Sequence, residues 1–167
     1  YSSFGSRNQA VLVGFQAQAG FLDIAGVRLF NYAGSPTGHA ITYALWSDPT
    51  EDGNPDDAQL LTSVDSTVGT SWQDVFFPKV TPIALGSWFY VGVYLRDLEK
   101  APFITGVDNG IPTGNSHQYN FLGDAAVDLS SLGTGAAEVH RWSADEGVGG
   151  NLLIRAIPQV SPAGVPE

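Results

Sequence analysis

The densest group of side chains that could do chemistry is a run of carboxylates in segment 48–57. It places five carboxylates in ten residues, among Pro, Gly and Asn residues that favour a turning backbone. Hard cations such as calcium take several oxygen ligands from loops of this composition. The candidate calcium ligands are Asp48, Glu51, Asp52, Asp56 and Asp57. Their spacing does not follow the EF-hand register, so a plain solvated acidic loop is the alternative.

Aromatic residues form the second candidate set. Exposed indole and phenol rings can stack on sugar rings, while polar neighbours fix the orientation of the sugar. The candidates for glycan stacking are Trp72, Tyr119 and Trp142. The alternative is burial, because most aromatic side chains fill cores. We expect Trp88, and with it Trp46, to fill the core between two sheets.

No motif for catalysis stands out. The three histidines, His39, His117 and His140, are far apart and lack any zinc-binding register. No Gly-x-Ser-x-Gly nucleophile elbow occurs. The carboxylate pair of a glycosidase is defined by a distance, which a sequence does not contain. The sequence therefore favours a protein that is not an enzyme.

The charge balance restricts the classes of partner. The 167 residues carry a formal charge of −10 and only seven Lys and Arg residues. Nucleic acids and anionic membrane surfaces both require clustered basic side chains, so neither is an expected partner. No run of 18 apolar residues occurs, so we expect no membrane insertion. A neutral polysaccharide or a divalent cation is compatible with this balance.

Short runs with a period of two predict β-strands between Gly- and Pro-rich turns. In the run 41–46, for example, Ile41, Tyr43 and Leu45 share one face and Trp46 lies on the other. The run 88–95 is apolar throughout and predicts a central strand covered on both faces. These spacings predict an all-β fold, an antiparallel two-sheet β-sandwich of jelly-roll-like type. The residues expected in one core are Phe15, Leu29, Tyr43, Leu45, Val75, Phe77, Tyr90 and Val93.

Strand signals weaken in residues 101–150, where we expect long loops and one hairpin. No second domain is evident, so residues 1–157 are expected to form a single β-sandwich domain. Residues 158–167 form a Pro/Gly-rich C-terminal tail that closes with Val165, Pro166 and Glu167. The absence of Cys and Met is consistent with an exported protein exposed to oxidants.

The tail resembles the sorting signal of bacterial PEP-CTERM proteins, in which a Val-Pro-Glu-Pro motif precedes a membrane span. By this resemblance Val165, Pro166 and Glu167 form the sorting motif, and the chain ends one proline short of its full form. The resemblance implies a protein that an exosortase has processed and that is located at the bacterial cell surface or outside the cell. A chance Pro-rich ending is the alternative.

A second resemblance covers about half of the chain. Gly14-Phe15, the run from His39 to Trp46 and the run from Pro82 to Gly92 are similar to a sandwich module of bacterial surface proteins. The function of that module is unassigned, and the segment from Asp48 to Ala58 is longer than the usual turn of the family. The resemblance implies a surface-exposed sandwich and supplies no catalytic residues.

These observations lead to two expectations for function. The first is a non-enzymatic extracellular protein of the cell surface or biofilm matrix that adheres to exopolysaccharide, with calcium as the candidate cofactor. The second is a structural subunit that assembles with copies of itself into a filament. In that case segment 1–10 or 156–167 would add as a strand to the sheet edge of a neighbour.

Overall fold

The computed structural model describes residues 6–19, 23–31, 37–96, 115–122, 127–133, 138–142 and 152–159. These ranges contain nine strands and one short 3-10 helix. In chain order they are β1 (Ser6–Gln16), β2 (Asp23–Asn31), β3 (Ala40–Ser47), η1 (Pro55–Asp57), β4 (Gln59–Thr67), β5 (Ser71–Pro82), β6 (Trp88–Leu95), β7 (Ser116–Leu122), β8 (Glu138–Trp142) and β9 (Ile154–Pro158).

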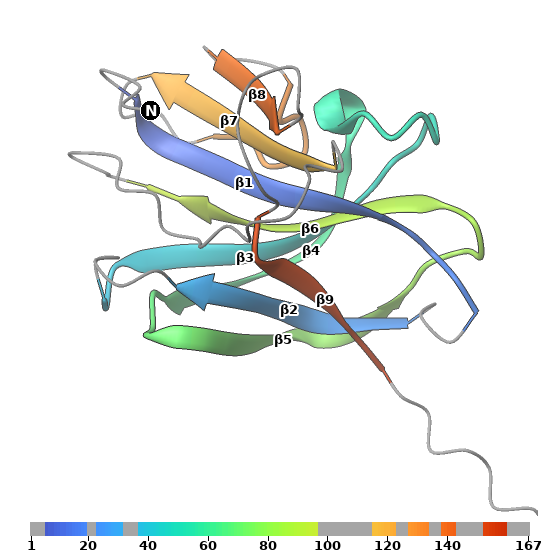
Figure 1. Ribbon diagram of the computed structural model, residues 1–167, viewed down its shortest axis with the longest axis horizontal. Helices are drawn as coiled ribbons and strands as arrows, with labels where there is room; N and C mark the ends of the chain where they lie inside the picture. Colours follow the sequence, from blue (N-terminus) through green and yellow to red (C-terminus); the bar gives the residue numbers. More distant parts are fainter. Residues whose placement is uncertain are drawn as a thin grey trace, which may run out of the picture.

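The strands form two antiparallel sheets that pack face to face (Figure 1). The large sheet has six strands in the order β4-β3-β6-β1-β7-β8, and the small sheet has three in the order β5-β2-β9. The predicted all-β two-sheet sandwich is confirmed. The predicted hairpin in the weakly patterned region also exists, because β7 and β8 pair antiparallel. The described residues contain no helix that is long and apolar enough to cross a membrane.

Strand β6 is the central strand of the large sheet, as the apolar run predicts. It pairs with β1 on one side and with β3 on the other. All of its residues except the half-buried Trp88 are buried. Gly92 lies where a side chain would collide with β1, since a Cβ atom there would be 2.3 Å from the carbonyl oxygen of Val11. The sequence of β6 thus fits a strand that is enclosed on both faces.

The first core fills the space between the two sheets. Five of the expected core residues are buried there, and they are Leu29, Tyr43, Leu45, Phe77 and Val93. The expected residues Phe15 and Val75 are partly buried and pack against the same cluster. This core joins the two sheets through the side chains that the period of two assigns to it.

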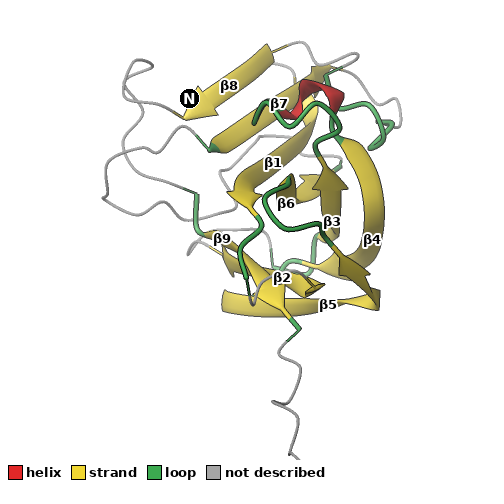
Figure 2. Cartoon of the chain, turned by 90° about the vertical axis from the view of Figure 1, so that its right-hand side faces the viewer, coloured by secondary structure: helices red, strands yellow, loops and turns green. Residues whose placement is uncertain are grey.

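A second core covers the opposite face of the large sheet, and here two expectations are wrong. Tyr90 and Trp46 lie in this second cluster and not between the sheets. The loop that carries η1 and the segment 127–133 contribute Ala58 and Leu132 to it. In Figure 2, η1 lies on the side of the large sheet away from β2 and β5. Tyr90 lies three positions from Val93 and Trp46 lies one position from Leu45, so the period of two places both on the face opposite to the first core.

Candidate functional site

The outer surface of the small sheet exposes several aromatic rings. In β5, Trp72 and Phe76 alternate with inward-facing residues, and their exposed fractions are 40% and 60%. Phe30 of β2 is the register partner of Trp72, and the two rings meet edge to face with centroids 5.3 Å apart. We call Phe30, Trp72 and Phe76 the outer aromatic face. Apolar rings exposed together on one sheet surface are typical of a binding surface.

Charged side chains lie among these rings. Arg28 of β2 donates two hydrogen bonds to the carboxylate of Asp74 in β5, at 2.5 and 2.6 Å. These bonds hold the pKa of the Asp74 carboxyl below its ordinary value. The guanidinium of Arg155 in β9 lies 4.8 Å from the centroid of the Trp72 ring, within the range of a cation–π contact. Both arginines can still donate to hydroxyl groups of a ligand, because a guanidinium carries five N–H groups.

The structure gives a different outcome for each of the three residues predicted to stack on glycans. Trp72 is exposed as that role requires. The prediction for Tyr119 is wrong, because its side chain is fully buried in the second core and its ring has no free face. Trp142 is the last residue of β8, and its side chain lies outside the described part of the structure.

The acidic segment forms a compact loop around one buried carboxylate. Asp48 is 2% exposed, and its Oδ1 accepts hydrogen bonds from the backbone N–H of Glu51 at 2.9 Å and from the N–H and hydroxyl of Thr50 at 3.2 Å. Its Oδ2 accepts from the N–H of Gly53 at 2.8 Å and from the hydroxyl of Tyr90 at 3.0 Å. These five donors occupy the acceptor sites of the Asp48 carboxylate.

The other carboxylates of the loop have different neighbours. Asp52 accepts from the N–H of Asn54, and Asp56 accepts from the buried hydroxyl of Tyr119 at 2.9 Å. One oxygen from each of Asp48, Asp52 and Asp57 lies within 4.8 Å of the others. A calcium ion needs six to eight oxygen ligands, and Asp48 has no acceptor site left. The calcium site predicted at this loop stays untested, and because it would depend on Asp52 and Asp57 we expect binding there to be weak.

The acidic loop also holds Trp88 at the start of β6. The carboxylate of Glu51 accepts the backbone N–H of Trp88 at 2.5 Å, and the N–H of Asp48 donates to the Trp88 carbonyl at 3.2 Å. A Cβ atom at Gly53 would lie 3.6 to 3.8 Å from the indole atoms of Trp88, so this glycine packs against the ring. The loop therefore fixes the position of a half-buried indole.

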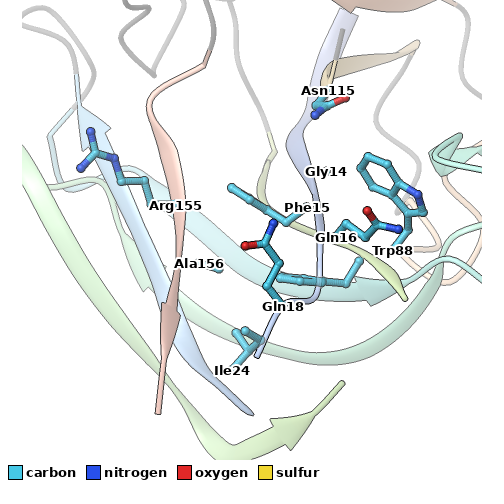
Figure 3. A pocket seen from close by; sticks show the side chains of 10 residues that line it. Gly14, Phe15, Gln16, Gln18, Ile24, Trp88, Asn115, Arg155 and Ala156 are labelled. Carbon is cyan, nitrogen blue, oxygen red and sulfur yellow. The ribbon is translucent and has the colours of Figure 1, made fainter. Parts of the chain in front are cut away.

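Trp88 lines a pocket of about 530 Å³ at the end of β1 (Figure 3). Its other lining residues come from β1, β2, β6 and β9 and from the residues that flank these strands: Gly14, Phe15, Gln16, Gln18, Ile24, Phe89, Asn115, Arg155 and Ala156. Phe15 and Phe89 stack with their centroids 5.7 Å apart. The side chain of Arg155 extends from β9 away from the pocket, on the side opposite to Phe15 and Gln18. The pocket is thus mainly apolar, with neutral amides among its walls.

No protein-family model matches the sequence, and neither does any curated protein. The motif residues Val165, Pro166 and Glu167 lie outside the described residues. What the protein binds must therefore be inferred from the chemistry of these surfaces.

Sequence reasoning placed Trp88 between the sheets and gave no role to Gln16, Gln18, Asn115 or Arg155. A signal for Trp88 was present, because Trp88 lies an odd number of positions from the inward-facing Phe89 and Val91. No comparable signal marks the amides, which line one pocket only because the end of β1 lies beside β9 and the residue before β7.

Proposed function

We propose that this is a non-enzymatic extracellular protein that binds polysaccharide through the outer aromatic face. The single observation that carries the proposal is the joint exposure of Trp72 and Phe76 on one surface of β5, with Phe30 beside Trp72. A folded protein gains stability by burying such rings. Two exposed rings on one sheet surface, with the half-buried Phe30 beside Trp72, therefore suit an external ligand better than they suit the fold.

The geometry of a strand suits an extended polymer. Trp72 and Phe76 are four residues apart on the same face, which places them about 13 Å apart along the strand. Their apolar rings can pack against the C–H faces of successive sugar units. Such contacts are tolerant of sugar identity, as the stacking of bases on aromatic side chains is tolerant of sequence.

Polar groups between the rings can fix the orientation of a bound sugar. Arg28, Asp74 and Arg155 lie on the same surface and offer donors and an acceptor to sugar hydroxyls. The ion pair is exposed, so it contributes little to the stability of the fold. Its oxygens and N–H groups remain close to water and accessible to a ligand.

The extracellular location has a separate basis. It rests on the resemblance of Val165, Pro166 and Glu167 to the PEP-CTERM sorting motif and on the absence of Cys and Met. The acidic charge of −10 favours neutral glycans over nucleic acid as partners.

The test is retention of the protein on polysaccharides: cellulose, chitin and a soluble β-glucan immobilised in a gel. We expect Trp72→Ala and Phe76→Ala each to weaken retention by about 1–3 kcal/mol, by analogy with one lost stacking contact. Leu61→Ala is the matched control, because Leu61 is 42% exposed on β4 and lies outside the outer aromatic face. Equal retention of all three variants and the parent protein would refute the proposal, provided that their thermal midpoints agree.

One observation favours the second candidate, self-assembly. Strand β9 pairs only with β2 among the described strands, so one edge of its backbone is open within that part of the structure. An extended segment of another copy could add there as a strand. Sedimentation of the parent protein and of variants lacking residues 1–5 or 163–167 tests this. Filaments that persist in both truncated variants would exclude these segments as the added strand.

A further inference from the structure

The pocket beside Trp88 lies where β1 loses its neighbour in the large sheet. Strand β7 pairs with β1 only as far as Val13, and the N–H of Gly14 makes one further bond to the carbonyl of Asn115 at 2.8 Å. Beyond this point β1 still pairs with β6 as far as Gln16. Within the described residues, the edge of β1 at Gln16 is therefore free of a neighbouring strand.

The pocket combines side chains from both faces of the large sheet at this free edge. Phe15 and Phe89 belong to the face that meets the small sheet, and they form an apolar floor with Ile24 and Ala156. Gln16 and Trp88 are register partners and lie side by side on the opposite face. Gly14 adds no side chain between the two groups, and a Cβ atom there would lie 2.9 Å from the ring of Tyr90.

Neutral amides supply the polar atoms of the pocket. Within the described part of the chain, the side chains of Gln18 and Asn115 make no hydrogen bond. Gln16 donates from Nε2 to the carbonyl of Gly86 at 2.9 Å, which leaves its own carbonyl oxygen able to accept. Each free amide can donate and accept at once, which matches a ligand whose groups are hydroxyls.

We propose that this pocket is a second binding site, which takes a single neutral sugar residue. The C–H face of a pyranose packs against the indole of Trp88, and its hydroxyls bond to the amides of Gln16, Gln18 and Asn115. The volume of about 530 Å³ lies within the usual range of small-molecule sites and is large enough for one sugar residue.

The charges around the pocket select against acidic sugars. Among the described lining residues Arg155 is the only charged one, and its side chain extends away from the pocket (Figure 3). Its guanidinium lies over the Trp72 ring instead. Glu51, whose carboxylate bonds to the backbone of Trp88, places negative charge nearby. A uronate would therefore meet repulsion without a compensating cation. A purely apolar ligand would leave the amides without water and without partners.

The test is a titration of the full chain with glucose, galactose, mannose and N-acetylglucosamine, followed by heteronuclear NMR of the Trp88 indole and the side-chain amides. Glucuronate and glucosamine are the charged comparisons. We expect at least one neutral sugar to shift the signals of Trp88, Gln18 and Asn115 together, and glucuronate to shift none of them. Tighter binding of a charged sugar, or no shift with any sugar at millimolar concentrations, would overturn the proposal.

Two variants keep the test independent of folding. Gln18→Ala and Asn115→Ala remove amides that bond to nothing within the described residues, so the thermal midpoint should not change. Combined, they should weaken binding of the neutral sugar by about tenfold to a hundredfold, as expected for two lost hydrogen bonds. Unchanged binding in the double variant would overturn the proposed site.

The variant Trp72→Ala separates this site from the outer aromatic face. It should lower retention on polysaccharide and leave the titration with single sugars unchanged. If the pocket proposal fails, the effect of Trp72→Ala on retention still stands. If Trp72→Ala does not change retention on polysaccharide, the titration of Trp88 with single sugars still tests the pocket.

Discussion

The hydroxyl of Tyr90 donates a buried 3.0 Å hydrogen bond to Oδ2 of Asp48, and this bond ties the acidic loop to the central strand of the large sheet. Tyr119 of β7 makes a second bond of this kind, to Asp56 at 2.9 Å. The loop is therefore attached to the sheet at two phenols. The segment is thereby fixed to the sheet through the buried carboxylate of Asp48 and through Asp56, while its other carboxylates stay exposed.

The two ends of the Tyr90–Asp48 bond should differ in their effect on stability. Tyr90→Phe removes one donor and should lower the free energy of unfolding by about 1 kcal/mol. Asp48→Ala leaves the N–H groups of Thr50, Glu51 and Gly53 and the Tyr90 hydroxyl unpaired, and should cost about 3 kcal/mol. Urea unfolding measures both, with Asp57→Ala as an exposed control. Equal losses for the two variants would contradict this account of the loop.

Alkaline pH should unfold the protein. Burial raises the pKa of the Tyr43, Tyr90 and Tyr119 phenols above their ordinary value, and the Asp48 and Asp56 carboxylates add to the effect at Tyr90 and Tyr119. In the unfolded chain a phenol loses its proton near pH 10. The stability that these groups contribute is therefore complete below about pH 10 and falls as the pH rises further.

Absorbance of tyrosinate and circular dichroism, recorded on the same samples, check this prediction. The absorbance of the buried phenols should appear together with the loss of strand signal. Ionisation of all six tyrosines at about pH 10 with the strands intact would contradict the burial. The double variant Tyr90→Phe/Tyr119→Phe lacks two of the buried phenols. Its free energy of unfolding should therefore fall less steeply above about pH 10 than that of the parent protein.

Much of the fold could be predicted from the sequence because alternation records burial directly. The apolar run of β6 indicated a central strand, and Leu29, Leu45 and Val93 indicated the core between the sheets. The place of Tyr90 on the opposite face follows from its odd separation from Val93, but the cover over that face could not be predicted, because the second core is built by segments 48–58 and 127–133. Neither segment has a periodic pattern, and only long-range contacts bring them over the sheet.

The candidate sites show the same limit. Trp72 was a candidate for glycan stacking with burial as the alternative; its ring is exposed on β5, and its role in glycan binding stays a prediction. Tyr119 bonds to Asp56 of the acidic loop and is buried, and burial by a distant segment leaves no local signal. Trp88 and the pocket amides likewise depend on where β7 stops pairing with β1.

Calcium should have little effect on the thermal midpoint. Protein donors already occupy the Asp48 carboxylate, so only Asp52 and Asp57 could contribute free oxygens to an ion near the site where the three carboxylates meet. A tightly bound ion would stabilise the native state by RT ln(1 + [L]/Kd). Differential scanning calorimetry with calcium and with chelator decides this. A calcium-dependent rise that disappears in Asp57→Asn would instead establish a metal site here.

Trp46 should hold segment 127–133 on the large sheet. Its buried indole N–H donates to the carbonyl of Leu129 at 2.7 Å. Trp46→Phe keeps an aromatic ring but leaves that carbonyl without its donor, so stability should fall by about 1–3 kcal/mol. Amide hydrogen exchange should accelerate at Ser131, which bonds to Asp128 within this segment. If exchange speeds up equally at Val91 in β6, the effect is global and the specific role is refuted.

Glu51 should position Trp88 at a cost in backbone strain. Its φ of 58° lies in the left-handed region, which non-glycine residues avoid. Its carboxylate nevertheless accepts the Trp88 N–H, and its own N–H bonds to Asp48.

Glu51→Ala keeps the strain and loses the carboxylate, so it should destabilise the protein by about 1–2 kcal/mol. Glu51→Gly loses the same bond but relieves about 1 kcal/mol of strain, so it should be the more stable variant. Both should shift the indole signal of Trp88 and weaken neutral-sugar binding in the pocket to the same extent. An unchanged indole signal in both variants would show that the acidic loop does not set the position of Trp88.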